Sequence, residues 1–341
     1  MQASSSEVYL NGKSVDFLSA DLKKQGGLTS ASFTFVIPKS DASFRKFWNQ
    51  EVLFFINKSD AYPIFRGRVE DTVISADNKV KFICGDALGS LTGNYKAQVT
   101  LDNSKNIDGL TPAASVKKMI EMANLGDIIG TDYIGETNPI IQMDILRGTY
   151  SIMDVISMIL SQVLTNEGTP RENIIKIIDD GKKSQLVFET KKDVDTVTPV
   201  KTYTYESNIV GFKVNNRKIP TTIVVNGAAG IRAAFTHSSA TSALGESFLT
   251  VSNKQLKSRA ACMDWGQKIF NANLKSQYEY ILDTFDGIYL EPNDVVKIID
   301  DKTDTAGNYT IIGKTISCGP NTFRLQLIIN KRPPILSNFT R

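Results

Sequence analysis

The chain has 341 residues, of which 41% are hydrophobic and 22% charged, and its formal net charge is +3. This length exceeds that of a single hydrophobic core, so we expect roughly two to four globular domains. The near balance of charge gives no reason to expect specific nucleic-acid binding, which requires a basic patch or stripe. No apolar run approaches the length needed to span a membrane, which excludes a transmembrane helix.

The cysteines and the N-terminal sequence favour a reducing compartment. Cys84, Cys262 and Cys318 are an odd number at wide spacing, so we expect three buried free thiols and no disulfide framework. The start of the chain lacks the basic and apolar stretches of a signal peptide. We therefore expect the protein to be made and folded in the cytoplasm.

Residues 1–97 are predicted to be mostly β, because apolar and polar residues alternate along several short runs. The expected elements are a hairpin of 14–22 and 30–38 with 25–27 in its turn, a helix over 40–50, and strands over 51–60, 63–72 and 80–88. The polar, turn-rich stretch 94–106 marks a predicted domain boundary.

Residues 98–204 have a different character and predict an α/β middle module. Thr111 can cap a helix that has Pro112 at its first position, and Ser151 followed by Asp154 indicates a second helix start. The expected elements are helices over 111–124 and 149–164 and strands over 173–181, 183–190 and 201–207.

Residues 205–335 return to a β-rich pattern, and 336–341 form a C-terminal tail. The Pro333–Pro334 pair prevents the last strand from continuing into this tail. The expected elements are a hairpin of 208–216 and 220–227, a small polar loop or extended arm over 229–247, a helix over 253–273, and strands over 294–304, 309–317 and 323–330.

The two β-rich segments follow the same order of elements, which predicts an internal repeat. Each has a hairpin, a helix, a β-branched run that begins near Val52 or Val295, and a following strand that carries Gly67 or Gly313. Trp48 and Trp265 lie in the predicted helices and are interpreted as equivalent core anchors. A duplicated unit would give a trimer six similar units around one axis.

The search for catalytic chemistry finds no convincing site. His237, the single histidine, lies in the polar loop and is expected to be a solvated surface residue. The segment Gly307 to Thr315 resembles a P-loop, but five residues separate its glycines and the intervening residues are strand-like. Asp300, Asp301 and Asp304 do not fit a calcium loop and are interpreted as a hairpin loop. The adjacent pairs Glu70–Asp71 and Asp179–Asp180 are interpreted as solvated turn residues, and the sequence leaves a glycosidase pairing across a cleft open for them. We therefore expect no catalytic residue, no cofactor and no metal site.

The order of elements and residue types resembles the baseplate hub proteins of contractile phage tails, of the late-control-D type, which are related to type VI secretion spikes. The N-terminal resemblance is carried by Ile64, Gly67, Val69, Val80, Phe82, Asp86 and Leu91. The C-terminal resemblance is carried by the segment 250–270 and by Leu290, Pro292, Val295, Tyr309, Gly313 and Leu325. Many members have Gly after the proline region, where this chain has Glu291, Pro292, Asn293 and Asp294.

The resemblance implies an α+β, mostly β fold with two similar tube-like β-barrel domains (1–97 and 205–335) and an inserted α/β module (98–204). It also implies a homotrimeric ring in the virion tail baseplate, assembled in the host cytoplasm. The implied partners are further copies of the chain, the tail tube protein and the spike protein, with the tape measure protein and the baseplate wedge as additional candidates. The sequence leaves two alternatives open, a tail-associated cell-wall hydrolase and a carbohydrate-binding adhesin module.

Overall fold

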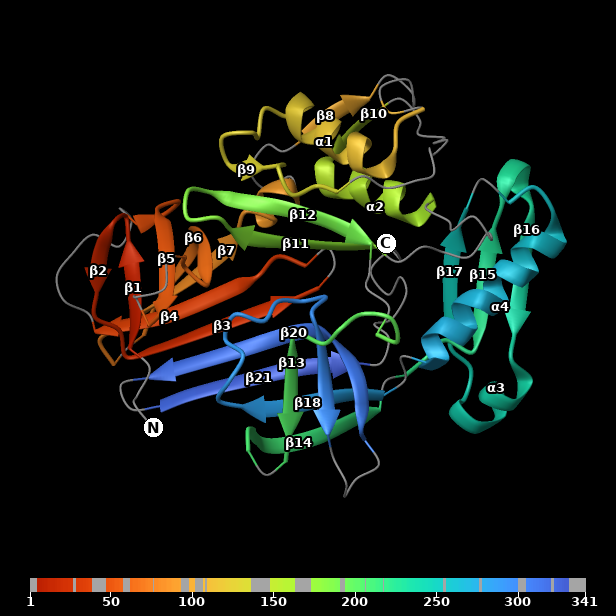
Figure 1. The fold of residues 1–341 in the computed structure, drawn as a ribbon. Coiled ribbons are helices and arrows are strands. Elements are labelled where there is room, and N and C mark those ends of the chain that lie inside the picture. Colours follow the sequence, from red (N-terminus) through yellow and green to blue (C-terminus); the bar gives the residue numbers. More distant parts are fainter. Residues whose placement is uncertain are drawn as a thin grey trace.

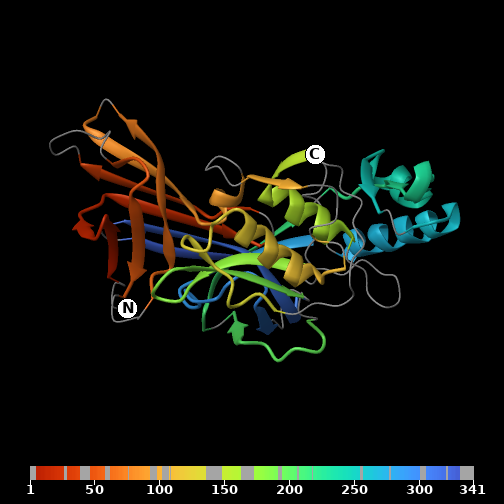
Figure 2. The ribbon, with the colours of Figure 1, turned by 90° about the horizontal axis from the view of Figure 1, so that it is seen from above.

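A computed structural model of the chain shows a long β-sheet that carries two smaller α/β parts (Figure 1). Seen from above, helices α1 (Pro112–Met122) and α2 (Ile152–Gln162) lie over the sheet, and the part that contains α4 (Arg259–Lys275) projects at one end (Figure 2). The structure describes residues 5–26, 29–38, 47–57, 62–75, 77–92, 98–101, 107, 109–135, 148–162, 173–190, 194–205, 207–216, 218–253, 256–275, 278–299, 305–319 and 322–330.

The first β-unit occupies one end of the long sheet, with strand order β3-β4-β7-β6-β5-β1-β2. Its predicted hairpin is confirmed, because β3 and β4 pair antiparallel. The helix predicted over 40–50 lies mostly outside the described residues. The strands are β1 (Ser6–Leu10), β2 (Lys13–Val15), β3 (Ser19–Gln25), β4 (Ser32–Pro38), β5 (Glu51–Ile56), β6 (Phe65–Ile74) and β7 (Lys79–Asp86).

The second β-unit continues the same sheet, with strand order β14-β18-β21-β20, and β19 pairs with β20 and β13. Strand β20 also pairs with β3, which joins the two units into one thirteen-stranded sheet. The strands are β13 (Lys201–Thr204), β14 (Ile209–Asn216), β18 (Tyr278–Thr284), β19 (Val295–Ile299), β20 (Gly307–Gly319) and β21 (Thr322–Asn330).

The two β-units share their order of pairing and the position of a bulge. In both units the order across the sheet begins with an antiparallel pair, β3–β4 or β14–β18. The remaining three strands follow in the reverse of their sequence order: β7, β6 and β5 in the first unit, and β21, β20 and β19 in the second. The register shifts between Val69 and Asp71 in β6, and between Ile311 and Gly313 in β20. Because bulges are positional features of a fold, their coincidence supports the predicted repeat.

The two units can be aligned by a row of residues that lie opposite one another on neighbouring strands. In the first unit it crosses β3, β4, β7 and β6, and in the second it crosses β14, β18, β21 and β20, ending in each case just before the bulge. The two rows are Leu22–Phe33–Cys84–Val69 and Val214–Tyr280–Ile329–Ile311. In this alignment Gly67 and Gly313, the glycines that suggested the repeat, are not counterparts, because Gly313 occupies the position of Asp71.

The hairpin predicted for 208–216 and 220–227 is wrong, because β14 pairs with β18 and β15 belongs to another sheet. A small α/β part is inserted between β14 and β18. Helix α4 packs against its strands β15 and β16, over a core that contains Trp265 and Phe270. Its elements are β15 (Thr222–Asn226), β16 (Arg232–Thr236), α3 (Ser238–Leu244), β17 (Phe248–Ser252) and α4 (Arg259–Lys275).

Two further expectations for these regions are corrected. The stretch 229–247 is no plain loop, because it contains β16 and α3. Trp265 is buried, but Trp48 is 66% exposed and is no core anchor. Phe47 makes the inward contact there, with an edge-on ring 5.7 Å from Phe82, so the next side chain points to solvent.

The middle module keeps most of its predicted helices and strands and has its own core. Thr111 Oγ1 accepts a hydrogen bond from the Ala114 N–H (3.2 Å) and Ser151 Oγ from the Asp154 N–H (3.1 Å), which confirms both predicted caps. Strand 201–204 pairs instead with β19 of the long sheet. The module's elements are β8 (Gln98–Leu101), α1 (Pro112–Met122), β9 (Ile129–Gly130), β10 (Gly148–Ser151), α2 (Ile152–Gln162), β11 (Asn173–Asp179) and β12 (Ser184–Thr190).

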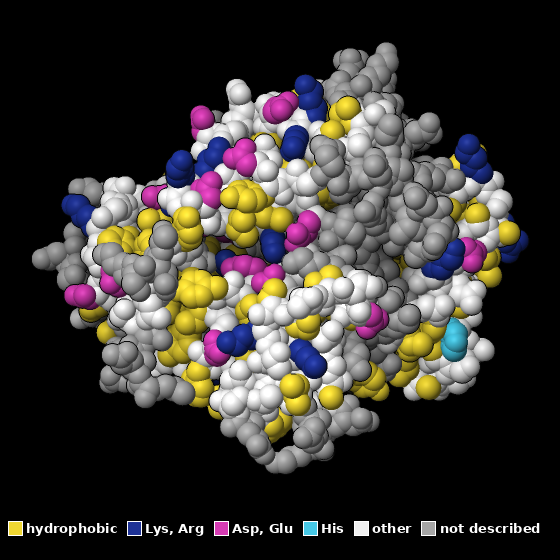
Figure 3. All heavy atoms as spheres, in the orientation of Figure 1, with side chains coloured by type: hydrophobic (Ala, Val, Ile, Leu, Met, Phe, Trp, Pro, Cys, Tyr) yellow, Lys and Arg dark blue, Asp and Glu magenta, His cyan; other side chains and the backbone are white. Residues whose placement is uncertain are grey.

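The protein is mostly β, as expected, and its described strands form open sheets with no closed barrel. On the face shown in Figure 3, the described basic and acidic side chains are interspersed with apolar ones, without a large patch of one sign. None of the described helices is long and apolar enough to cross a membrane. The tube-like barrels and the domain boundaries at 97 and 204 stay predictions.

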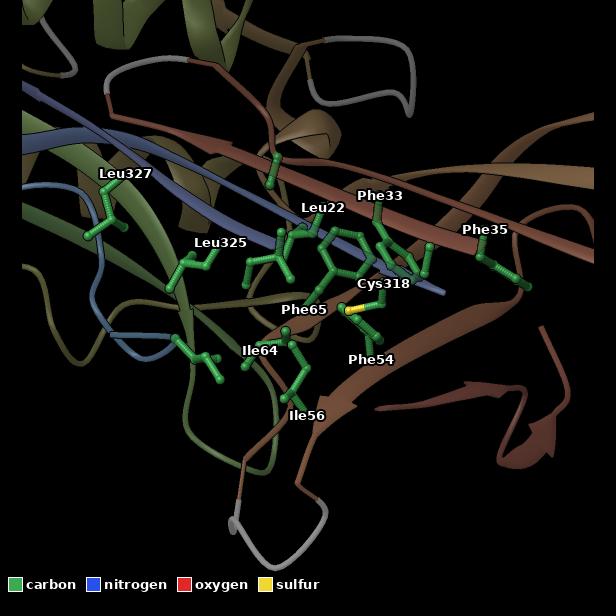
Figure 4. Packing of buried hydrophobic residues seen from close by; sticks show 14 of the residues in the cluster. Leu22, Phe33, Phe35, Phe54, Ile56, Ile64, Phe65, Cys318, Leu325 and Leu327 are labelled. Atoms are coloured by element: carbon green, nitrogen blue, oxygen red, sulfur yellow. The ribbon is translucent and has the colours of Figure 1, made fainter. Parts of the chain in front are cut away.

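The core of the long sheet is continuous across the junction of the two units. Phe33 stacks on Phe54 with ring centroids 4.7 Å apart and lies 5.0 Å from Phe65. Leu325 and Leu327 of the second unit extend the same cluster (Figure 4). Each such aromatic pair is worth about 0.5–1.5 kcal/mol beyond the burial of its surface. The two units therefore share one core.

Candidate functional site

His237 caps a short helix and makes no catalytic contact among the described residues. Its Nδ1 accepts a hydrogen bond from the Ala240 N–H (3.2 Å), and its ring stacks on Phe270 with centroids 4.5 Å apart. The expectation of a solvated loop histidine is corrected, because the side chain is half-buried against α4.

The sequence segments that resembled ligand loops lie in the sheet or outside the described residues. Gly307 to Thr315 is part of β20, so its backbone groups take part in strand pairing and form no phosphate cradle. Asp71 accepts a hydrogen bond from the Thr72 N–H (2.7 Å) beside the β6 bulge. Asp300, Asp301 and Asp304 lie outside the described residues.

The carboxylate pair Asp179 and Asp180 is structural. Asp179 forms an ion pair with Arg66 of β6, which docks the middle module on the first β-unit. Asp180 accepts hydrogen bonds from the Lys183 and Lys182 N–H groups (2.9 Å each). These hydrogen bonds, led by the one from Lys183, lower the pKa of Asp180 to about 2. Asp180 therefore stays ionised at neutral pH, and Asp179 is held by Arg66, so neither is a candidate general acid.

The described residues contain no cluster of three or more His, Cys, Asp or Glu side chains that could hold a metal ion. All three cysteines are buried and free, as expected. Burial raises the pKa of the Cys318 thiol to about 12, so it carries no thiolate at neutral pH. These thiols are therefore poor nucleophiles.

A cavity of about 140 Å³ lies between β6 and the middle module. Its lining mixes both signs of charge: Arg66, Arg68, Lys182 and Lys183 face Glu51, Asp86 and Asp127. The Arg66 guanidinium is already bound by Glu51 (2.6 Å) and Asp179, so it is not available to a ligand.

The residues that carry the family resemblance have structural roles. Ile64, Val69, Val80, Phe82 and Leu91 are buried, as are Val295, Tyr309 and Leu325 of the second unit. Asp86 accepts hydrogen bonds from the Ser30 hydroxyl (2.7 Å) and the Ala31 N–H (3.0 Å), and thereby fixes the start of β4 to the end of β7. Burial raises the pKa of this carboxyl.

The most unusual polar group is a buried charge cluster at the junction of the two β-units. Lys314 of β20 has a fully buried side chain and donates hydrogen bonds to the Ile288 and Leu290 carbonyls (2.8 Å each). Both Lys314 and Lys24 of β3 contact the same Glu291 carboxylate oxygen at 3.0 Å. The cluster therefore fixes both units to the segment that precedes β19.

The electrostatics of this cluster follow from its burial. Desolvation lowers the pKa of Lys314 to about 8, although Glu291 opposes the shift. For Glu291, burial raises the pKa, but Lys24 and Lys314 lower it more, so the net shift is downward. Sequence reasoning missed this cluster. The only signal in the sequence was a lysine within a predicted strand. Because Lys314 lies between Gly313 and Thr315, it was considered only as part of the segment that resembles a P-loop.

A second set of contacts attaches the middle module to the same segment. Lys176 of β11 lies 3.5 Å from Glu189 and donates a hydrogen bond to the Pro292 carbonyl (3.0 Å). Asn293 donates a hydrogen bond to Glu189 (2.6 Å). Glu291 to Asn293 is therefore the point where both β-units and the middle module meet, which gives the departure from the family pattern a structural role.

Several strands of the sheet have an edge without a described strand partner: β2 and β13 each pair with one described strand, and β14 and β6 provide two further free edges. Strand β14 pairs only with β18, and β6 pairs with β5 over Phe65–Arg68 but not beyond this stretch. Exposed apolar side chains accompany the β6 and β14 edges: Val73 and Ile74 of β6 are 47% and 53% exposed, and Val210 and Val214 of β14 are 57% and 50% exposed. Free edges of this kind are sites for pairing with another chain.

No family model and no curated protein matches the sequence. The fold is similar to that of several solved structures, of which three are described. A tail protein from Neisseria meningitidis MC58 has a TM-score of 0.66 at 14% identity, with 95% of each chain covered. The 43 kDa tail protein of prophage MuSo2 from Shewanella oneidensis has a TM-score of 0.61 at 13% identity, covering 96% of this chain and 97% of that one.

The third is the Escherichia coli c3393 protein, a component of the type VI secretion system, with a TM-score of 0.59 at 12% identity. The match covers 97% of this chain and 77% of that one. Similarity at this level of identity concerns the fold alone. The chain therefore has the fold of known phage tail proteins, over almost its full length.

Proposed function

We propose that the protein is a structural hub of a phage tail baseplate, in which three copies form a ring between a sixfold tail tube and a threefold spike. The observation that carries the proposal is the repeat. Two β-units with the same pairing order and the same bulge lie side by side in one sheet. Three such chains would offer six similar units, which is the number that a sixfold tube requires.

The shared fold with tail proteins supports a place in the virion tail. The proposed partners are further copies of the chain, the tail tube protein and the spike protein, with the tape measure protein and baseplate wedge as additional neighbours. The interfaces would be built from backbone pairing and side-chain packing. No reacting group is needed, which agrees with the structural roles of Asp179, Asp180 and His237.

Light scattering coupled to size-exclusion chromatography tests the oligomeric state, and electron microscopy of the purified particle tests its symmetry. We expect a concentration-dependent species of three chains and class averages with six similar lobes around a central hole. A monomer at every concentration, both alone and with tube and spike proteins, would contradict the hub.

The two alternatives make different predictions. A cell-wall hydrolase would release soluble fragments from purified peptidoglycan with turnover. A carbohydrate-binding adhesin would bind glycans as an isolated monomer. We expect neither result, because Asp179 and Asp180 are engaged in structural contacts and the described aromatic residues pack mainly in the cores.

A further inference from the structure

The junction inside the chain provides a template for the contact between chains. Strand β3 of the first unit pairs antiparallel with β20 of the second, just past the β20 bulge. At this junction Leu22 lies opposite Ile316, and both side chains are fully buried. The chain thus shows how the hairpin strand of one unit completes the bulged strand of another.

The same two surfaces recur, uncovered, at the free edges. Val214 of β14 is the counterpart of Leu22, because each stands at the start of its aligning row. Ile74 of β6 is the counterpart of Ile316 of β20. Each follows its aligned residue, Val69 or Ile311, at the same interval, and the bulge lies at the same place in between. Ile74 and Val214 are 53% and 50% exposed, whereas their counterparts at the junction are fully buried.

We propose that β14 of one copy pairs antiparallel with the Asp71–Ile74 edge of β6 in the next copy, so that Val214 lies opposite Ile74. The register follows from the internal junction, which also places Asn215 opposite Val73 and Lys213 opposite Ser75. This inference rests on the proposed trimer and adds the strands and the register by which its members join.

The contact is head-to-tail, because different edges of the two copies meet. Such contacts close into a ring only if the rotation per copy divides a full turn, and otherwise produce filaments. Within the chain, β3 of the first unit pairs with β20 of the second unit in the same head-to-tail manner. Each contact between copies would therefore repeat the rotation that relates the two units of one chain. The bulge marks where the β6 edge begins, and the Thr72 N–H, which donates to the Asp71 carboxylate (2.7 Å), would exchange this bond for one to β14 when the strands pair.

Disulfide trapping tests the register. Ile74→Cys and Val214→Cys are introduced together into the full chain, whose three native cysteines are buried and stay unreactive. Directly opposite residues in adjacent strands have Cα atoms about 4.5–5.5 Å apart, which suits a disulfide. We expect mild oxidation to convert most of the protein into covalent trimers on a non-reducing gel, through a dimer intermediate.

A matched control moves one cysteine along the same strand. Val210→Cys with Ile74→Cys uses a residue that is also exposed, at 57%, but lies about 13 Å further along β14 at roughly 3.3 Å per residue. We expect at least tenfold less cross-linking from this pair. Equal or greater cross-linking from the control would overturn the register.

A second measurement separates the edges from the trimer itself. Val214→Lys and Ile74→Lys alter exposed side chains, so we expect both variants to keep their circular dichroism spectrum and to lose at least tenfold in trimer affinity. Val200→Lys changes another residue, 56% exposed, as the control. A trimer that forms normally in both edge variants would refute this inference and leave the hub intact. A chain that stays monomeric in the presence of its partners and never cross-links would count against both the strand pairing and the hub. Open oligomers larger than trimers would refute the closed ring.

Discussion

Glu291→Gln should loosen the junction between the two β-units more than any other single exchange of one polar atom. The substitution keeps the size of the side chain but removes the charge that Lys24 and Lys314 both contact at 3.0 Å. Lys314 has a fully buried side chain, so its ammonium would lose its carboxylate partner and keep only neutral acceptors, the Ile288 and Leu290 carbonyls and the oxygen of the new amide. Removing one partner of a buried ion pair costs about 3–5 kcal/mol.

Hydrogen exchange measured by mass spectrometry provides the assay, because it resolves the peptides that cover β3 and β20. Where exchange follows an opening equilibrium, about 3 kcal/mol corresponds to roughly a hundredfold faster exchange. The matched control is Asp264→Asn, which removes a carboxylate that binds Lys268 at 2.8 Å on the exposed face of α4. Exposed helical pairs contribute about 0.3–0.5 kcal/mol, so this change should be nearly silent. Exchange in β3 and β20 that stays within threefold of the wild type would refute the reasoning.

Three further predictions follow from the described contacts. The pKa of Lys314 falls to about 8 in the folded protein, below its ordinary value of 10.5, so the unfolded chain binds more protons at pH values between the two. The stability measured in urea titrations should therefore rise with pH across this window. Lys314→Met should remove this rise. Thr111→Ala removes the α1 cap and should cost about 1 kcal/mol in denaturant titrations, whereas Thr111→Ser should cost less. Gly67→Ala would place a methyl group 2.2 Å from the Gly85 carbonyl oxygen, so we expect a lower melting temperature in calorimetry, whereas Gly126→Ala, which meets no neighbouring atom, should change it little.

Much of the local structure could be predicted, because its signals lie within a few residues. The β3–β4 pair follows from alternation, as Phe33 and Phe35 share one face. The α1 start follows from Thr111 and Pro112, whose effects act within one helical turn. The three buried thiols follow from the same local logic.

The errors arise where pairing is not local. Strand β15 follows β14 in the sequence and has the same character, but β14 takes its partner from beyond the inserted α/β part. Nothing in the alternation of Val214 or Val224 specifies which sheet each will join. The sequence also matched the wrong residues of the two repeat copies. The bulge that aligns Ile311 with Val69 has no signature in the residue types, so the correct alignment could not be found from them.

The buried cluster lay beyond sequence reasoning for a different reason. A lysine in a strand is usually read as a solvent-facing residue, and Lys24 and Lys314 are far apart in the sequence. Only the β3–β20 pairing brings both ammonium groups to Glu291. A long-range pairing must be known before the charges that depend on it can be recognised.

The ladder between β3 and β20 also sets an order of events during synthesis. Ser317 and Asp21, which share a hydrogen bond of 2.6 Å across it, are 296 positions apart in the chain. Strand β3 leaves the ribosome early, with its hairpin partner close behind, and must wait with an uncovered side until β20 has been made. We expect truncated chains that end before β20 to aggregate with one another and with nascent copies, so that only molecules that contain β20 enter assembly.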